Sequence, residues 1–106
     1  MIAFETFETL KKGEYIAATT IEACEKLYEL IKTNEKISHG ISYWILAARL
    51  MRMSYPNYLR YIRDELGGEI VKNNEIIYTY VIKDKKVCDN LVKELNERWN
   101  EWEASL

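Results

Sequence analysis

The sequence concentrates its basic side chains in the central part of the chain. The segment 36–82 carries six Lys and Arg residues against four Asp and Glu residues, although the whole chain has a formal net charge of −2. Four of them precede Asp64 with no acidic residue in between, and these are Arg49, Arg52, Arg60 and Arg63. How charge is distributed matters more for the choice of partner than its sum. The cluster predicts contact with phosphate groups, and a solvated helix surface is the alternative.

Metal chemistry is not indicated. His39 is the only histidine, and Cys24 and Cys88 are isolated cysteines without CxxC spacing, so the pattern of a zinc site is missing. We expect His39 to be solvated or to cap a helix. We expect the two cysteines to be buried thiols in a reducing compartment, with a disulfide as the alternative.

Catalytic chemistry is not indicated either. The spaced glutamates, such as Glu94 and Glu97, fall on expected helix surfaces and give no sign of an acid–base pair in a cleft. The pair Gly67-Gly68 is not followed by the Lys-Ser/Thr of a phosphate-binding loop. We therefore expect no enzyme activity and no cofactor.

Length and composition predict one intracellular domain. The chain has 106 residues, 48% hydrophobic and 30% charged, enough to bury a single core. The first 13 residues contain early glutamates and no long apolar run, so we expect no signal peptide. No stretch approaches the roughly 20 apolar residues of a membrane span. We expect a cytoplasmic protein with no membrane partner.

Hydrophobic spacing predicts two helices in the first third of the chain. Phe4, Phe7 and Leu10 recur every three residues and suggest a short helix that ends at Gly13. A second helix is expected from Thr19, as its cap, to about Thr33.

The middle of the chain predicts a helix, a turn and a second helix. The apolar segment 41–53 is expected to be a helix buried on most of its surface. Ser54 and Pro56 suit the start of the next helix, and Gly67-Gly68 suits its end. The inward stripe of this second helix is expected to consist of Tyr55, Leu59, Ile62 and Leu66.

The last third predicts a hairpin and a long helix. Residues 69–82 alternate β-branched and aromatic side chains around Asn73-Asn74, which suits a tight turn. Residues 83–106 return to helical spacing, with Leu91, Leu95, Trp99 and Trp102 on one face. Such a long amphipathic helix usually needs a partner. Trp99 and Trp102 either fold back onto the first helices as core residues or anchor a dimer.

The stretch 45–66 resembles the helix-turn-helix core of many bacterial, archaeal and viral regulators. Ala47 or Ala48 corresponds to the small residue at the helix crossing, Met53 to the apolar turn residue and Ser54 to the cap of the second helix. Many relatives carry Gly where this chain has Met51 or Arg52. With the following hairpin, the resemblance implies a mainly α protein with a small β-hairpin wing (α+β), a winged helix-turn-helix.

The resemblance implies three parts within the single domain 1–106. Residues 1–18 would be an N-terminal extension, 19–82 the winged-helix core, and 83–106 a C-terminal helix that forms a homodimer. The expected dimer contacts are Leu91, Leu95, Trp99, Trp102, Phe4 and Phe7.

In this family the second helix enters the major groove of DNA with its N-terminal part. Arg suits guanine and Asn suits adenine because each makes two parallel hydrogen bonds. The wing commonly touches the DNA backbone or the minor groove. The expected DNA-binding residues are Arg49, Arg52, Ser54, Tyr55, Asn57, Tyr58, Arg60, Tyr61, Arg63, Lys72, Asn73 and Asn74.

The resemblance therefore implies a sequence-specific binder of double-stranded DNA, a dimeric regulator of transcription. The alternative is a winged-helix module that binds another protein and has no DNA role, for example a small viral or phage protein acting on a host factor in the host cytoplasm. The net negative charge and the many aromatic residues favour this alternative.

Overall fold

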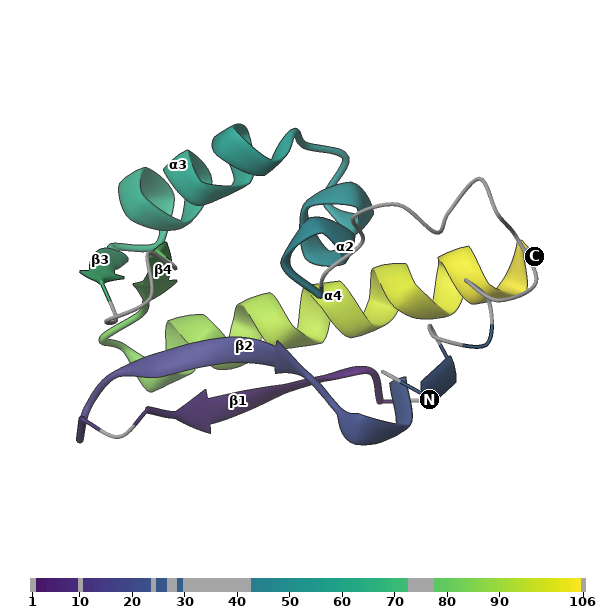
Figure 1. Ribbon diagram of the computed structural model, residues 1–106, viewed down its shortest axis with the longest axis horizontal. Coiled ribbons are helices and arrows are strands. Elements are labelled where there is room, and N and C mark those ends of the chain that lie inside the picture. The colour runs from purple at the N-terminus through teal and green to yellow at the C-terminus, as the bar shows by residue number, and fades with distance from the viewer. Residues whose placement is uncertain are drawn as a thin grey trace.

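The elements follow one another in the order β1, β2, α2, α3, β3, β4, α4 (Figure 1). The computed structural model describes residues 2–9, 11–23, 25, 26, 29, 43–72 and 78–105. The bounds are β1 Phe4–Glu8, β2 Tyr15–Thr19, α2 Tyr43–Leu50, α3 Tyr55–Glu65, β3 Glu69–Lys72, β4 Tyr78–Val81 and α4 Lys85–Ala104. The chain is thus an α+β protein with a C-terminal helix, and this part of the prediction is confirmed.

The N-terminal segment is a β-hairpin, and the prediction of a short helix that ends at Gly13 is wrong. β1 pairs with β2 in antiparallel register, with Phe4 opposite Thr19 and Glu8 opposite Tyr15. Gly13, expected to end a helix, instead lies in the turn between the strands with a φ of 85°, which glycine adopts without steric cost.

The hairpin packs on α4 and belongs to the core. Asn96 on α4 accepts hydrogen bonds with its Oδ1 from the backbone amides of Ala3 and Phe4, both 2.8 Å long, and donates one to the Phe4 carbonyl at 3.1 Å. Ala3, Phe4 and Ala17 are buried. The described part of the segment 1–18, which was expected to be an extension, therefore contributes Ala3, Phe4 and Ala17 to the core.

The first helix predicted after the hairpin is described only in part. Residues 21–23, 25, 26 and 29 are helical. The cap is Thr20, whose Oγ1 accepts a hydrogen bond from the Ala23 amide at 3.3 Å, and not Thr19. Cys24 and His39 lie outside the described residues, whereas Cys88 is a buried free thiol.

Helix α2 ends at Leu50, three residues before the end of the apolar segment 41–53, because the chain reverses at Arg52. Met53 therefore lies in the turn before α3. The Arg52 amide donates to the Arg49 carbonyl at 3.0 Å and the Met53 amide to the Ala48 carbonyl at 2.9 Å. This pair of bonds is a Schellman motif, which needs a left-handed residue at its centre. Arg52 is that residue, with a φ of 58°.

Helix α3 begins as predicted. Ser54 is its N-cap and accepts a hydrogen bond from the Asn57 amide, and Pro56 lies in the first turn. Its deepest side chains are Tyr58 and Ile62, whereas Leu59 is only half-buried. The buried stripe is therefore rotated by about one residue from the predicted one.

Two glycines with different roles follow α3. Gly67 has a φ of 66°. The Gly68 amide donates to the Ile62 carbonyl at 2.9 Å, and a Cβ at Gly68 would lie 2.6 Å from Ile62 Cγ2. The chain can pass this close to α3 only because Gly68 lacks a side chain.

Strands β3 and β4 form the predicted antiparallel ribbon, in a different register. Lys72 lies opposite Tyr78, whereas a two-residue turn at Asn73-Asn74 would place it opposite Glu75. The two asparagines themselves lie outside the described residues. Just beyond β4, Ile82 forms an isolated bridge with Tyr15, which joins the ribbon to the N-terminal hairpin.

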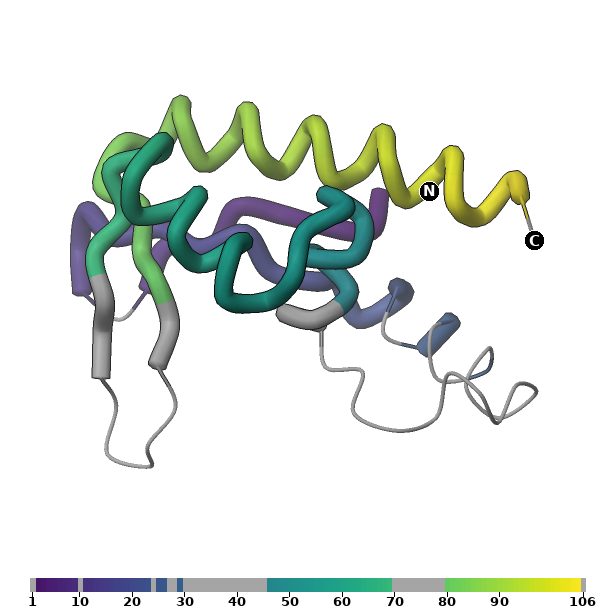
Figure 2. The backbone as a smooth tube through the Cα atoms, turned by 90° about the horizontal axis from the view of Figure 1, so that it is seen from above, coloured from purple at the N-terminus to yellow at the C-terminus, as the bar shows by residue number. Residues whose placement is uncertain are grey.

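Helix α4 holds the parts together. Asp84 caps it by accepting from the amides of Lys86 and Val87. Its apolar stripe of Cys88, Leu91, Leu95 and Trp99 is buried. It contacts both strands of the N-terminal hairpin and also α2, and Figure 2 shows it running the length of the molecule alongside α2 and α3. None of the described helices combines the length and apolar character needed to cross a bilayer.

Candidate nucleic-acid interface

The exposed surface of α3 carries the polar side chains that the sequence singled out. Asn57, Arg60, Arg63 and Asp64 are exposed, and their spacing of three or four residues places them on one side of the helix. This side is opposite the buried Tyr58 and Ile62. A shallow hollow of about 370 Å³ follows it, lined by Met53, Asn57, Arg60, Tyr61, Asp64 and Glu65.

Two side chains on this surface hold each other in place. Arg60 donates from Nη1 to Oδ1 of Asn57 at 3.0 Å, one turn away on the same helix. The bond leaves the other guanidinium donors of Arg60 and the amide group of Asn57 for a ligand. The pair is thus presented at a fixed spacing on the first two turns of α3.

Arg63 is already neutralised by its neighbour. Its Nε and Nη2 donate to the two carboxylate oxygens of Asp64 at 2.7 and 3.0 Å. The hydrogen bond from Arg63 lowers the pKa of Asp64 below its ordinary value, so the carboxylate stays ionised. Arg63 would have to exchange this partner before it could bind a phosphate.

Arg49 and Arg52 are the available cations at the start of this surface. Arg49 lies in the last turn of α2 and Arg52 in the turn before α3. Both are exposed. Neither guanidinium group has a hydrogen bond or ion pair within the part of the chain that the structure describes. Arg52 keeps its left-handed backbone at a cost of about 1 kcal/mol relative to glycine.

Arg98 was not predicted as a site residue, and it lies next to these two arginines. It donates from Nη1 to the Leu50 carbonyl at 2.9 Å and from Nη2 to Glu94 at 3.1 Å. With Arg49 and Arg52 it lines a hollow of about 290 Å³. The spacing of Glu94 and Arg98 indicates an ion pair on one helix face, but no sequence signal indicates that the side chain reaches α2.

One predicted DNA-contacting residue is unavailable. Tyr58 is 1% exposed, because the buried stripe of α3 includes it, so its prediction as a contact is wrong. Ser54 is exposed, and Tyr55 and Tyr61 are half-buried. Asn73, Asn74 and the side chain of Lys72 lie outside what the structure describes.

The predicted dimer surface on α4 is largely internal. Leu91, Leu95, Trp99 and Phe4 are between 0 and 4% exposed within a single chain, because the N-terminal hairpin covers the face that was expected to need a second copy. Their prediction as dimer contacts is therefore wrong. Phe7 is 42% exposed and Trp102 is half-buried.

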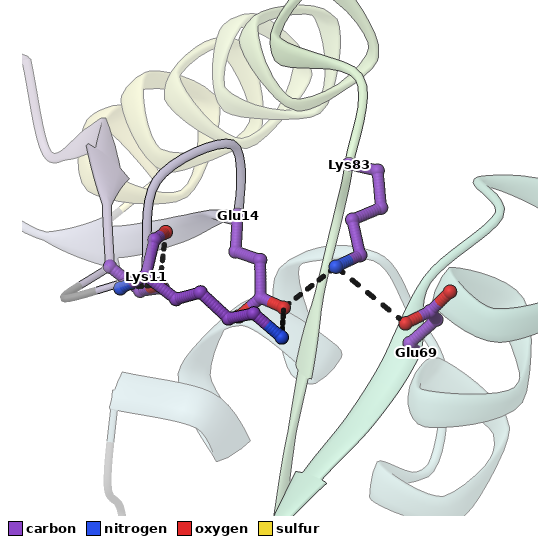
Figure 3. Close-up of polar contacts among 5 residues, drawn as sticks. Lys11, Glu14, Glu69 and Lys83 are labelled. Atoms are coloured by element: carbon purple, nitrogen blue, oxygen red, sulfur yellow. Dashed lines mark hydrogen bonds and ion pairs between the residues drawn. The ribbon is translucent and has the colours of Figure 1, made fainter.

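A second polar cluster joins the two hairpins (Figure 3). Glu14 is buried, and Lys83 donates to it at 2.7 Å; Lys11 lies 3.6 Å away, and Lys83 also approaches Glu69 at 3.7 Å. The hydrogen bond from Lys83 lowers the pKa of Glu14, against its burial, which acts in the opposite direction. The cluster is a structural link at neutral pH, when the carboxylate is ionised and paired.

Within the described ranges, no group of three or more His, Cys, Asp or Glu side chains is arranged to hold a metal ion. No protein-family model, characterised protein or solved structure compared with the chain matches it. Its function is therefore inferred from its own side chains and their geometry.

Proposed function

We propose that the protein binds double-stranded DNA as a winged helix-turn-helix regulator of transcription, with α3 in the major groove. The observation that carries the proposal is the exposed stripe of Asn57 and Arg60 on the first turns of α3. It is directly preceded by Arg49 and Arg52, whose side chains have no partner among the described residues. The ribbon of β3 and β4 would be the wing.

In this arrangement the residues divide into two groups. Asn57 and Arg60 reach base edges, where paired hydrogen bonds distinguish adenine and guanine. Arg49 and Arg52 reach phosphates, which fix the orientation of the helix without reading sequence. The existing bond between Arg60 and Asn57 supports the proposal because it orders both side chains before DNA arrives.

The proposal does not include a dimer through α4. Four of the six side chains expected at the dimer interface are buried within a single chain. One copy offers four arginines between α2 and the end of α3, of which Arg63 is paired with Asp64. We therefore expect weak, salt-sensitive binding by a single copy.

One observation favours the alternative, a surface that binds another protein. The two arginines of α3 are matched in number by Asp64 and Glu65, so the helix itself has no net charge. A surface of this kind suits a polar protein partner as well as a duplex.

Fluorescence anisotropy with a labelled random duplex tests the proposal. We expect affinity to fall steeply with salt concentration. Replacing both Arg49 and Arg52 by Gln should lower the slope of log K against log[salt] by about 2. Replacing both Lys86 and Lys93 by Gln, at two exposed sites on α4, is the matched control for the loss of two positive charges.

A second pair of variants tests base recognition. After selection of a preferred site, Arg60→Gln should relax specificity by about 1–3 kcal/mol at one position, whereas Lys93→Gln should not. Absence of any duplex binding at about 50 mM salt would contradict the proposal and favour the protein-binding alternative.

A further inference from the structure

The hollow between α2 and α4 combines charge with an aromatic surface. Its described lining residues are Arg49, Leu50, Arg52, Arg98, Glu101, Trp102 and Ser105. Three arginines, one glutamate and one half-buried tryptophan thus line the same hollow. The volume of about 290 Å³ is near the lower limit for small-molecule sites.

Most charged side chains of this hollow form no ion pair with one another. Within the described residues, the side chains of Arg49 and Arg52 have no hydrogen-bond or ion-pair partner, and no ion pair joins either of them to Glu101. Arg98 is the exception, because it donates a hydrogen bond to the Leu50 carbonyl at the end of α2 and forms an ion pair with Glu94. Two guanidinium groups therefore remain for an anion, and one carboxylate remains to accept a hydrogen bond.

The indole of Trp102 packs against a buried aromatic neighbour. Its ring centroid lies 5.1 Å from that of the buried Trp99 at an interplanar angle of 56°. A stacking surface that is packed in this way loses little side-chain freedom when a planar ligand covers it.

We infer that this hollow is a nucleotide-binding site: the phosphate binds to Arg49 and Arg52, and the base stacks on Trp102. Arginine binds phosphate through parallel hydrogen bonds, and a base stacks on an aromatic side chain irrespective of its sequence. Glu101 is placed to accept a hydrogen bond from an exocyclic amino group. The nucleotide is either free or the end unit of a single strand.

The inference about the hollow does not depend on duplex binding, although the two share Arg49 and Arg52. If α3 also binds DNA, a bound nucleotide would compete with the duplex for these two arginines. Trp102 and Glu101 belong to the hollow alone, and Arg60 belongs to the surface of α3 alone. Variants of these residues therefore separate the two activities.

Isothermal titration calorimetry with AMP, ribose 5-phosphate and adenosine tests the site. We expect AMP to bind at least about tenfold more tightly than either fragment, because only AMP uses both the stacking surface and the arginines. Arg52→Gly and Trp102→Leu should each weaken AMP binding at least about tenfold. Arg52→Gly suits the left-handed backbone at this position, so its effect is not attributable to misfolding.

Arg60→Gln and Lys93→Gln are the controls and should leave AMP affinity unchanged. A single-stranded oligoadenylate is titrated in parallel: tight binding that needs Trp102 and Arg52, with weak binding of AMP, would support the same site with nucleic acid as the source of the nucleotide. No heat with either ligand up to about 5 mM, or AMP binding unaffected by both Arg52→Gly and Trp102→Leu, would overturn the inference.

Discussion

Arg98 of α4 donates a hydrogen bond of 2.9 Å to the carbonyl oxygen of Leu50, the last residue of α2. The last carbonyls of a helix have no partner within it, and a cation at this end also interacts favourably with the negative end of the helix dipole. The bond fixes the end of α2 against α4 immediately before the turn that sets the direction of α3.

Arg98→Ala should lower the free energy of unfolding by about 1–2 kcal/mol, because it removes a charge-assisted hydrogen bond. Glu94→Gln removes the ion pair with Arg98 and leaves the bond to Leu50, so its effect should stay within about 0.5 kcal/mol. Urea unfolding of the two variants measures the difference. Equal losses would show that the ion pair, and not the contact with α2, is what matters.

Gly68→Ala should destabilise the protein by about 1–3 kcal/mol. The added Cβ would lie 2.6 Å from Ile62 Cγ2 and 3.0 Å from the Ile62 carbonyl oxygen, and a buried β-branched side chain cannot move away without strain. Gly67→Asn is the comparison, because its φ of 66° suits Asn and nothing lies near its Cβ. In thermal unfolding, the Tm of Gly67→Asn should be close to that of the wild type, and the Tm of Gly68→Ala should be well below both.

Glu14→Gln should reduce stability at pH 7 and change its dependence on pH. The pKa of Glu14 is lowered below 4.5 in the folded protein, first by the hydrogen bond from Lys83. The stability that it contributes is therefore present above pH 4.5 and is lost as the pH falls through the folded-state pKa. The difference in free energy of unfolding between wild type and variant, measured with urea, should therefore decrease as the pH falls below 4.5.

Glu97→Gln, at an exposed position on α4, is the matched control for the loss of one negative charge. A gap for Glu14→Gln that persists unchanged from pH 7 to pH 3 would contradict a role for the ionised carboxylate.

Trp99→Ala should cost about 3–5 kcal/mol of stability, because the indole is fully buried in a single chain. Replacing the half-buried Trp102, at the edge of the core, by Ala should lower the free energy of unfolding by less. Light scattering at several concentrations accompanies the unfolding experiments. Loss of a dimer without loss of monomer stability in Trp99→Ala would contradict the burial of Trp99 within a single chain.

The parts of the fold that depend on local signals were predictable. Ser54, Pro56 and Gly67 bound α3 through caps and backbone preferences that act within a few residues. The N-terminal hairpin was not, because Phe4 and Phe7 are spaced as in a helix. The two-residue period is concealed by Thr6, which faces α4 as a polar residue and binds Asp89 at 2.6 Å.

Because the N-terminal hairpin was not predicted, the face of α4 that it covers was predicted to be a dimer surface. An apolar helix face signals that something covers it and does not say whether the cover comes from the same chain. For the candidate site, the arginines were visible in the sequence as a cluster. Which of them are paired was not, since Asp64 and Glu94 could each have pointed to solvent, and the contact of Arg98 with a carbonyl 48 residues away leaves no pattern.

The bonds between Asn96 and the amides of Ala3 and Phe4 join residues 93 and 92 positions apart. During synthesis β1 therefore leaves the ribosome long before α4, on which it packs, has been made. Until then its apolar side chains are exposed to solvent or bound by chaperones. Pairings between such distant residues slow folding. The rate at which α4 docks on the hairpin should thus set how long a newly made chain is vulnerable to aggregation and proteolysis.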